Sequence, residues 1–289
     1  MEIHVPGEWY PLVNILEEKK EITLLLGATD TGKSTLAKYL ISRLCQKGIK
    51  AALVDADIGQ SFLGPPTTIG LSISESPPDW DKRLFPEIFF VGSTTPEGNF
   101  PLHLKGTKKM VHRALCQGAE VVLVDTTGFV FGEYGKELKK RKIELLQPRF
   151  VIALQRAEEI EHILTLYRDD PSPRIFRLQP SAEARSRTWE ERKSYRMRKF
   201  QEYFNRSEMQ EIPIDEIRFE GEWSALSIKG LLLGLKNSDD NTLALGILDH
   251  FSEEKRLITL LTPLRETGNV RTIQTGSLML TSSFEDERF

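Results

Sequence analysis

The chain has 289 residues, 39% of them hydrophobic and 28% charged, which is typical of a globular protein with one large or two smaller domains. Its formal net charge of −3 excludes a global field that recruits nucleic acid, so a polyanion site has to be a local basic patch. No apolar run reaches transmembrane length, and the N-terminal residues lack the basic and apolar regions of a signal peptide. Cys45 and Cys116 have no metal-binding spacing and imply no disulfide, so we expect a cytoplasmic protein with no membrane partner.

The first functional signal follows a short N-terminal segment. Residues 1–18 are expected to form a lead-in, an extended arm that ends in a helical turn, before an apolar strand at 21–26. Residues 27–35 match the phosphate-binding pattern G-x-x-x-x-G-K-[ST], and residues 34–45 have the apolar spacing of a helix. In this setting, backbone N–H groups and a helix N-terminus converge on phosphate oxygens. The residues expected to bind the nucleotide are Gly27, Thr29, Asp30, Thr31, Gly32, Lys33, Ser34 and Thr35.

Two of these side chains have individual roles in the expected P-loop. Lys33 is expected to reach the β- and γ-phosphates, and the Ser34 hydroxyl is expected to hold Mg²⁺. A second predicted strand, at 50–56, ends with Asp55, and Asp57 and Gln60 follow. Because ligands bind at the carboxyl ends of strands in open α/β sheets, these polar side chains are expected to face the phosphates and the metal.

The next part of the chain alternates strands and helices. The expected elements are a rigid loop at 64–70, a polar connection at 71–86, a strand at 87–92 followed by a loop that contains Thr95, a helix at 104–117, a strand at 119–124, a helix at 132–146, a strand at 149–154, a helix at 158–167 and a short strand at 174–178. This alternation predicts a parallel sheet with helices on both faces.

Two strand ends in this region carry further information. The strand at 119–124 leads into Asp125, the Walker B pattern of an apolar strand and a carboxylate that supports Mg²⁺ directly or through water. The metal set expected from the sequence is therefore Ser34, Asp55 and Asp125. After the strand at 149–154 the chain reads Gln155-Arg156 where a guanine-specific GTPase has Asn-Lys-x-Asp, which argues against that class.

The most basic stretch of the chain lies at 181–205. From 185 to 199 it has seven basic and two acidic residues, a local charge of 7 − 2 = +5. Arg192 and Arg196 are four residues apart and share one helix face. A solvated basic helix explains such a run, but the preference for arginine over lysine favours phosphate recognition.

The pattern of apolar and turn residues changes near residue 209. Short apolar runs separated by turn residues predict strands at 214–219, 227–235, 243–249, 257–261, 270–274 and 277–280. The expected fold class is therefore an α/β P-loop NTPase sheet followed by a small all-β C-terminal domain. The expected boundaries are a lead-in at 1–18, a P-loop domain at 19–208 with an arginine-rich lid near 181–205, and the β domain at 209–289.

The combined motifs resemble one family, the polynucleotide 5′-hydroxyl kinases related to the RNA kinases of pre-mRNA 3′-end cleavage and ribosomal RNA processing. The resemblance rests on residues 27–34, on Asp57-Ile58-Gly59-Gln60, on Thr95-Pro96, on residues 125–129 and on the arginine run that ends in Tyr203-Phe204. It covers nearly all of the chain from about residue 19, and the short form is similar to prokaryotic members.

The resemblance implies roles for individual residues. It assigns Asp57 to positioning and deprotonating the acceptor hydroxyl, and Gln60 and Thr95 to acceptor or phosphate contacts. Arg187, Arg192 and Arg196 have the family's lid spacing. Some members have a tryptophan where this chain has Phe129, an aromatic that can stack on the terminal base.

The expected activity is transfer of the γ-phosphoryl group of ATP, with Mg²⁺, to the 5′-OH end of RNA, with DNA ends as a second candidate acceptor. Lys33, Asp57, Arg192 and Arg196 are the expected catalytic residues. Two other functions stay open: a non-catalytic ATP-binding scaffold of an RNA-processing complex, and a P-loop switch ATPase.

Overall fold

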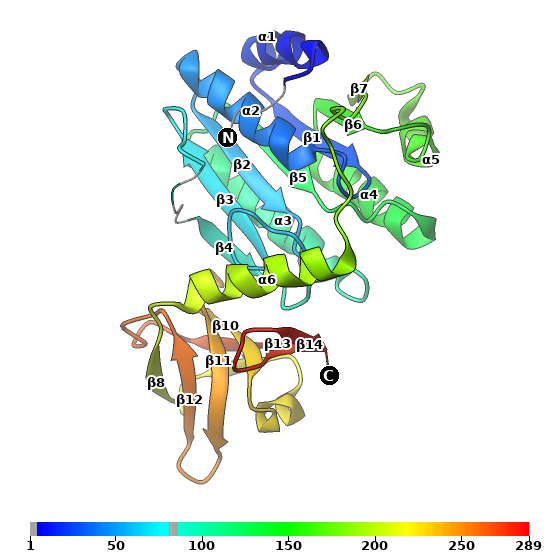
Figure 1. Ribbon diagram of the computed structural model, residues 1–289. Coiled ribbons are helices and arrows are strands. Elements are labelled where there is room, and N and C mark those ends of the chain that lie inside the picture. The colour runs from blue at the N-terminus through cyan, green and yellow to red at the C-terminus, as the bar shows by residue number, and fades with distance from the viewer. Residues whose placement is uncertain (1–4, 81, 83–85, 289) are drawn as a thin grey trace. The chain divides into compact units, whose positions relative to one another are not determined.

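A computed structural model describes residues 5–80, 82 and 86–288 and divides the chain into two compact units (Figure 1). Unit 1 comprises residues 1–57, 69–86 and 96–187, and unit 2 comprises residues 58–68, 87–95 and 188–289. The domain boundaries expected at 18 and 208 stay predictions. Within the described ranges, no helix combines the length and the apolar character needed to cross a lipid bilayer.

Unit 1 is built on a sheet with the strand order β3-β2-β5-β1-β6-β7. Its strands are β1 (Ile22–Gly27), β2 (Ala51–Ala56), β3 (Thr68–Ser74), β5 (Val121–Thr126), β6 (Phe150–Leu154) and β7 (Arg174–Leu178). The strands from β2 to β7 in this order pair in parallel, so the predicted P-loop α/β class is confirmed. Because both faces of the sheet are covered, β2, β5 and β6 are buried along their whole length, as their apolar sequences require.

One strand of this sheet departs from the expected loop at 64–70 and polar connection at 71–86. β3 pairs antiparallel with β2, with Leu71 opposite Val54. Its sequence alternates apolar residues with glycine and serine, and Ile69 and Leu71 are buried. The Pro65-Pro66 pair lies just before the strand and therefore does not interrupt the hydrogen bonds between β3 and β2.

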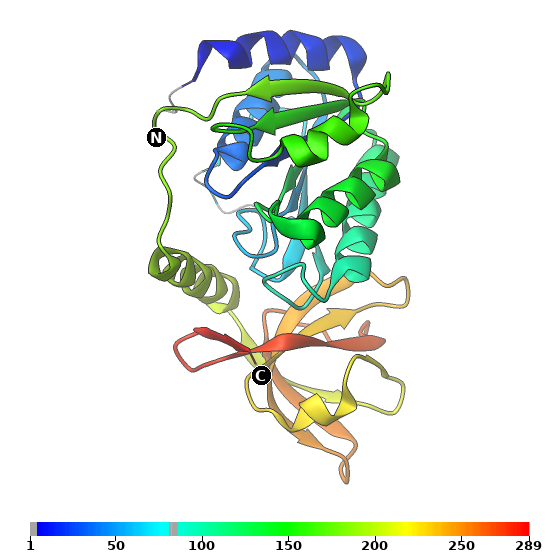
Figure 2. The same ribbon diagram turned by 90° about the vertical axis from the view of Figure 1, so that its right-hand side faces the viewer.

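The helices of unit 1 follow from the strand order. The long helices are α2 (Lys33–Gln46), α3 (Phe100–Cys116) and α4 (Gly132–Leu146). From β1 the chain crosses to β2 on one side, whereas from β5 it crosses to β6 on the other. Right-handed crossovers in opposite directions place α2 and α4 on opposite faces of the sheet, as Figure 2 shows, and α3 packs beside α4.

Two short helical segments differ from their predictions. The lead-in contains a 3₁₀ turn, Gly7–Trp9, followed by α1 (Tyr10–Lys19), because Trp9, Leu12, Val13 and Leu16 bury one face of the segment. The helix expected at 158–167 consists of α5 (Glu161–Leu164) and a 3₁₀ turn, Thr165–Tyr167.

Unit 2 is mainly antiparallel β structure with one long helix, α6 (Trp189–Phe204). Its strands are β4 (Glu87–Phe90), β8 (Glu208–Pro213), β9 (Arg218–Glu220), β10 (Leu231–Lys236), β11 (Thr242–Ser252), β12 (Leu257–Thr262), β13 (Thr272–Leu280) and β14 (Asp286–Arg288). The order is β14-β13-β10-β11-β4, with β12 pairing to β11 and β8, and β9 pairing to β13. A 3₁₀ turn, Trp223–Ser227, precedes β10.

The core of unit 2 lies on both sides of β10. Leu231, Leu233 and Leu235 belong to one buried cluster, whereas Leu232 belongs to a second cluster. That second cluster includes Phe90 of β4 and Phe200 and Phe204 of α6, so the basic helix is attached to the sheet by its apolar face.

Three predicted strand boundaries in unit 2 were wrong. The runs at 270–274 and 277–280 form the single strand β13, and the run at 214–219 contributes only to β9. β8 precedes that run and pairs with β12, but most of its side chains are exposed, so it has no apolar alternation that a sequence pattern could reveal.

Candidate active site

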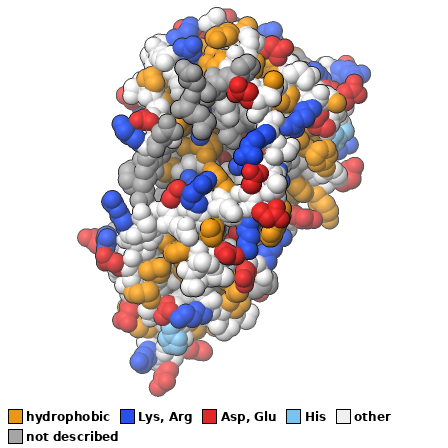
Figure 3. Space-filling view, in the orientation of Figure 1, with side chains coloured by type: hydrophobic (Ala, Val, Ile, Leu, Met, Phe, Trp, Pro, Cys, Tyr) orange, Lys and Arg blue, Asp and Glu red, His pale blue; other side chains and the backbone are white. Residues whose placement is uncertain are grey.

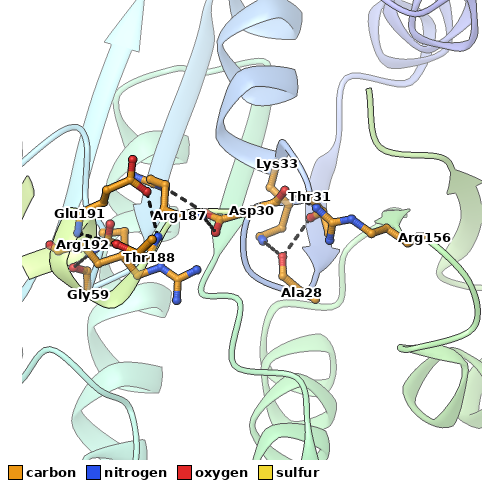
Figure 4. Close-up of polar contacts among 11 residues, drawn as sticks. Ala28, Asp30, Thr31, Lys33, Gly59, Arg156, Arg187, Thr188, Glu191 and Arg192 are labelled. Carbon is orange, nitrogen blue, oxygen red and sulfur yellow. Dashed lines mark hydrogen bonds and ion pairs between the residues drawn. The ribbon is translucent and has the colours of Figure 1, made fainter. Parts of the chain in front are cut away.

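The P-loop occupies the turn between β1 and α2 in unit 1. Gly32 caps α2 with φ +91°, a left-handed conformation that suits glycine, and its carbonyl accepts the Leu36 N–H at 2.9 Å. The Lys33 Nζ donates to the Ala28 carbonyl at 2.7 Å, and the Thr31 Oγ1 donates to the same oxygen at 3.0 Å (Figure 4). Burial lowers the pKa of Lys33, while the nearby Asp125, Asp57 and Asp30 carboxylates oppose that shift. The lysine therefore lies inside the loop, with the carboxylates within electrostatic reach.

Two of the three residues expected to support the metal lie at adjacent strand ends, and the third, Ser34, lies at the start of α2. Asp55 of β2 and Asp125 of β5 are paired across the parallel ladder, and both are buried. The Ser34 hydroxyl donates to Asp125 Oδ2 at 2.5 Å. Burial, and then the charge of Asp55, raises the pKa of Asp125 to about 7.

This donor set fits a divalent cation. Asp125 Oδ1 is buried and accepts no hydrogen bond from the described residues. A cation beside Asp55 and Asp125 would relieve the repulsion that holds the pKa of Asp125 up. Within the described residues, no three His, Cys, Asp or Glu side chains form a complete metal cage. Mg²⁺ binds through one or two protein oxygens together with phosphates and water.

Asp57 lies just beyond the end of β2, in the same unit as the P-loop. Its backbone N–H donates to Asp55 Oδ1 at 3.1 Å, and its side chain is half-buried. Its charge acts on Lys33 and on Asp125. Unit 1 thus brings together Lys33, Ser34, Asp55, Asp57 and Asp125, a cation and carboxylates at one edge of the sheet.

The loop after β5 packs directly on the P-loop. A Cβ on Gly128 would lie 2.5 Å from the Thr29 backbone nitrogen, so only glycine allows the two loops to approach this closely. The Phe129 N–H donates to Thr127 Oγ1 at 3.1 Å, and Thr126 Oγ1 donates to the Leu25 carbonyl of β1 at 2.8 Å. These contacts hold Phe129, which is half-buried, beside the nucleotide loop.

Two buried lysines of α4 were not identified from the sequence. The Lys139 Nζ donates to Thr126 Oγ1 at 3.0 Å and to the Thr127 carbonyl, so it ties α4 to the loop after β5. The Lys142 Nζ is fully buried and has no hydrogen-bond acceptor within the described residues. Burial lowers the pKa of Lys142 to about 7, against the opposing charges of Asp57 and Asp125.

The sequence contained a signal for these lysines. The buried positions of α4 are 135, 138, 139, 142, 143 and 146, and both lysines fall on this stripe. Burial also lowers the pKa of Lys139 well below its usual range, with the charges of Lys142 and Lys33 adding to the effect. Behind them His103 of α3 places its Nε2 3.1 Å from the Ala56 carbonyl, and burial lowers its pKa well below the ordinary value.

Two arginines contact Asp30 of the P-loop. Arg187 donates from its backbone N–H to Asp30 Oδ2 at 2.8 Å and from Nε to Oδ1 at 3.2 Å (Figure 4). Arg156, which follows β6, donates from Nη2 to the Asp30 carbonyl at 2.8 Å. Arg156 is a further residue that sequence reasoning missed, although its position at a strand end was a usable signal.

The remaining predicted site residues lie in unit 2. α6 begins with a capping box in which Thr188 Oγ1 accepts the Glu191 N–H and the Glu191 carboxylate accepts the Thr188 N–H. Gln60 Nε2 lies 3.4 Å from the Arg192 carbonyl of α6. The Thr95 N–H donates to Ser93 Oγ at 3.2 Å.

Arg196 has a carboxylate partner within unit 2. Its Nε lies 2.9 and 3.0 Å from the two oxygens of Asp286 on β14, and both side chains are largely buried. Lys193 pairs with the neighbouring Glu285 at 2.6 Å. Arg196 therefore connects α6 to the C-terminal strand.

The amino-acid sequence of this chain is similar to those of known proteins. Residues 27–206 match the family described as mRNA cleavage and polyadenylation factor CLP1 P-loop. A polyribonucleotide 5′-hydroxyl-kinase of Methanocaldococcus jannaschii is 30% identical, over 91% of this chain and 88% of that protein. One from Pyrococcus furiosus is 29% identical, over 96% and 93%.

A solved structure of a wild-type Clp1p–Pcf11p complex has a similar fold, with a TM-score of 0.77 and 13% identity over 96% of this chain and 80% of that one. The family match spans the P-loop, the loop after β5 and all of α6. The chain therefore belongs to the CLP1 P-loop family.

Proposed function

We propose that this protein is an ATP-dependent polynucleotide 5′-hydroxyl kinase, a phosphotransferase with an alcohol acceptor at the 5′ end of RNA. The observation that carries the proposal is the position of Asp57 beside Lys33 and the Ser34–Asp125 pair in unit 1. A P-loop binds the phosphate donor. A half-buried carboxylate beside it can orient an incoming hydroxyl and accept its proton. The names of the archaeal relatives support the same activity.

The nucleotide side of the reaction is assigned to the P-loop. Backbone N–H groups of 27–33 bind the phosphates, and Lys33 moves from the Ala28 carbonyl to the β- and γ-phosphates. Ser34, Asp55 and Asp125 are the residues that would hold Mg²⁺, and the bound ion would supply positive charge to the transferring group. Thr35 is exposed at the start of α2, where its hydroxyl is available to a nucleotide.

The acceptor side is assigned to Asp57, which orients the 5′-OH and takes its proton. Phe129 stacks on the terminal base. Gln60, Thr95 and Arg187 contact the acceptor or the phosphates. The lid arginines Arg192 and Arg196 neutralise the charge that develops in a loose, metaphosphate-like transition state.

The experiment is transfer of labelled γ-phosphate to matched 5′-OH oligonucleotides of RNA and DNA. Wild-type protein with ATP and Mg²⁺ is expected to label the RNA, and the DNA arm measures the sugar preference. Lys33→Ala and Ser34→Ala are each expected to abolish labelling while the circular dichroism spectrum stays unchanged.

Two results would contradict the assignment. ATP hydrolysis that depends on a protein partner and ignores 5′-OH ends would identify a switch ATPase, and ATP binding without transfer would identify a scaffold. Near-normal transfer by Lys33→Ala would show that this loop is not the phosphate site.

A further inference from the structure

Two aromatic rings near the start of α4 are unusually exposed. Phe131 is 62% exposed and Tyr134 is 65% exposed, although both are large apolar side chains. Tyr134 meets Phe100, at the start of α3, edge to face with ring centroids 6.2 Å apart. Phe131 is the extended residue that precedes α4, and Tyr134 lies in the first turn of the helix. We call Phe100, Phe131 and Tyr134 the aromatic platform.

The exposure of these rings is imposed by the packing of their neighbours. Val130 is fully buried, and a Cβ on Gly135 would lie 2.6 Å from the Val130 carbonyl carbon. The helix start therefore packs on the backbone of Val130, whose carbonyl also lies 3.0 Å from His162 Nε2. With positions 130 and 135 held inward, positions 131 and 134 face outward. A rigid surface of this kind loses little conformational entropy when it binds a ligand.

The platform continues the proposed active site. It follows directly after the loop 125–129, which packs on the P-loop through Gly128 and Thr29. α4 starts after the carboxyl end of β5, at the edge of the sheet where the phosphates bind. Phe129, which is proposed to stack on the terminal base, is two residues before Phe131 in the sequence.

The helix α3 beside the platform is basic, whereas the first turn of α4 carries the exposed Glu133. α3 contains Lys105, Lys108, Lys109 and Arg113 and no acidic residue, and Lys105 and Lys108 are exposed. Hydrophobic side chains also lie at the surface among charged ones where α4 and α5 are drawn (Figure 3). Exposed rings next to a basic helix are the combination that binds single-stranded nucleic acid.

We propose that the aromatic platform is a stacking subsite for the bases that follow the 5′-terminal nucleotide of a single-stranded acceptor. The proposal rests on the proposed kinase function and goes beyond it by naming the form of the substrate. Stacking on an aromatic ring requires an unstacked base, which a 5′ overhang offers and a blunt duplex does not. The subsite is tolerant of sequence, because every base has a π-face.

The test measures KM and kcat for 5′-OH acceptors of one to five nucleotides, beginning with a nucleoside 3′-phosphate. For wild-type protein, KM is expected to fall as the second and third nucleotides are added. Phe131→Ala and Tyr134→Ala are each expected to raise KM for the tetranucleotide by about tenfold, the order that one stacked base contributes. They are expected to leave kcat, and KM for the single nucleotide, unchanged. Tyr134→Phe keeps the ring and is expected to retain wild-type KM.

Tyr10 on α1 offers a matched control in unit 1. It is 53% exposed and meets Tyr39 edge to face with centroids 6.3 Å apart, so Tyr10→Ala removes a comparable ring. α1 lies apart from α4 in both ribbon views (Figures 1 and 2). Tyr10→Ala is expected to keep the wild-type dependence on length. An abasic sugar at position two or three is expected to raise KM for wild-type protein but not for the alanine variants.

The outcomes separate the subsite from the kinase function. If wild-type protein phosphorylates every acceptor with the same KM, or if blunt duplexes and overhangs are used equally, the subsite is overturned and the kinase function stands. Losses in Phe131→Ala and Tyr134→Ala that are the same at every length, or that Tyr10→Ala shares, also overturn it. If wild-type protein transfers no phosphate to any 5′-OH acceptor, the kinase function fails and the subsite with it.

Discussion

Asp57 differs from the other two carboxylates at the strand ends of unit 1, because it is half-buried whereas Asp55 and Asp125 are buried. An amide at this position keeps the shape of the side chain but cannot accept a proton. We therefore expect Asp57→Asn to lower kcat by roughly 10²–10⁴-fold, the range of general-base contributions. The variant is expected to bind ATP as the wild type does, measured by titration calorimetry. An unchanged kcat would transfer the role to Asp55 or Asp125.

Lys142 should make the stability of the protein depend on pH. Its pKa of about 7 in the folded state lies below the ordinary value of 10.5, so between these values the unfolded chain binds the extra proton. Stability therefore rises with pH from about 7 to 10.5, by at most about 1.4 kcal/mol per pH unit from this group. Lys142→Met removes the titration, so we expect a higher melting temperature than wild type at pH 7 and a smaller difference at pH 9.

Thermal unfolding of both proteins at pH 7, 8 and 9 tests this expectation. Exposed Lys140 is on the same helix, and Lys140→Met controls for the loss of a positive charge. A difference between wild type and Lys142→Met that is the same at all three pH values would contradict the expected titration.

At the scale of an element, α6 combines two arginines with different surroundings. Arg196 is held by both oxygens of Asp286, whereas the Arg192 carbonyl lies beside Gln60. The guanidinium fork matches two phosphate oxygens and an ammonium does not. We expect Arg192→Lys and Arg196→Lys to lower kcat much more than they weaken ATP binding, by up to the roughly 10³–10⁵-fold that arginines supply in phosphoryl transfer.

A lower kcat in Arg196→Lys has two explanations, loss of a phosphate contact or loss of the contact that holds α6 on β14. Steady-state kinetics of Asp286→Asn distinguishes them. If Arg196 acts on phosphate, removing the Asp286 charge leaves kcat near the wild-type value. If Asp286→Asn lowers kcat as much as Arg196→Lys does, then Arg196 serves to hold α6 on β14. Wild-type kcat in both lysine variants would show that neither arginine acts on the transferring phosphate.

At the scale of the whole molecule, the segment 181–205 contains the point where the chain passes from unit 1 to unit 2, and it contains the arginines that we propose form a lid. Residues 181–188 precede α6, and the side chain of Arg185 is exposed to solvent. Lids order when substrates bind. We expect trypsin to cleave this segment readily in the apo protein and much more slowly with ATP, Mg²⁺ and a 5′-OH oligonucleotide. Lys33→Ala is the control, since it should gain no protection, and equal cleavage of wild type with and without ligands would contradict lid closure.

The sequence by itself determined the features that depend on neighbouring residues. The P-loop is a contiguous pattern of backbone conformations, so Gly27–Thr35 could be placed before any strand pairing was known. The helix at 132–146 and the strand at 174–178 were predicted with the bounds that the structure gives. Asp125 could be placed near the end of a strand because a buried parallel strand is a continuous apolar run.

Only the tertiary structure decided which distant side chains meet. Arg187 contacts Asp30 across 157 positions, and Arg196 contacts Asp286 across 90. The antiparallel pairing of β3 and the burial of Lys139 and Lys142 likewise depend on which surface covers each element. Local hydrogen bonding and periodicity set the type of an element, whereas its partners are chosen by the apolar surface that the whole chain buries. For that reason the P-loop was predicted from local sequence. The burial of Lys139 and Lys142 and the contact of Arg187 with Asp30 required the fold.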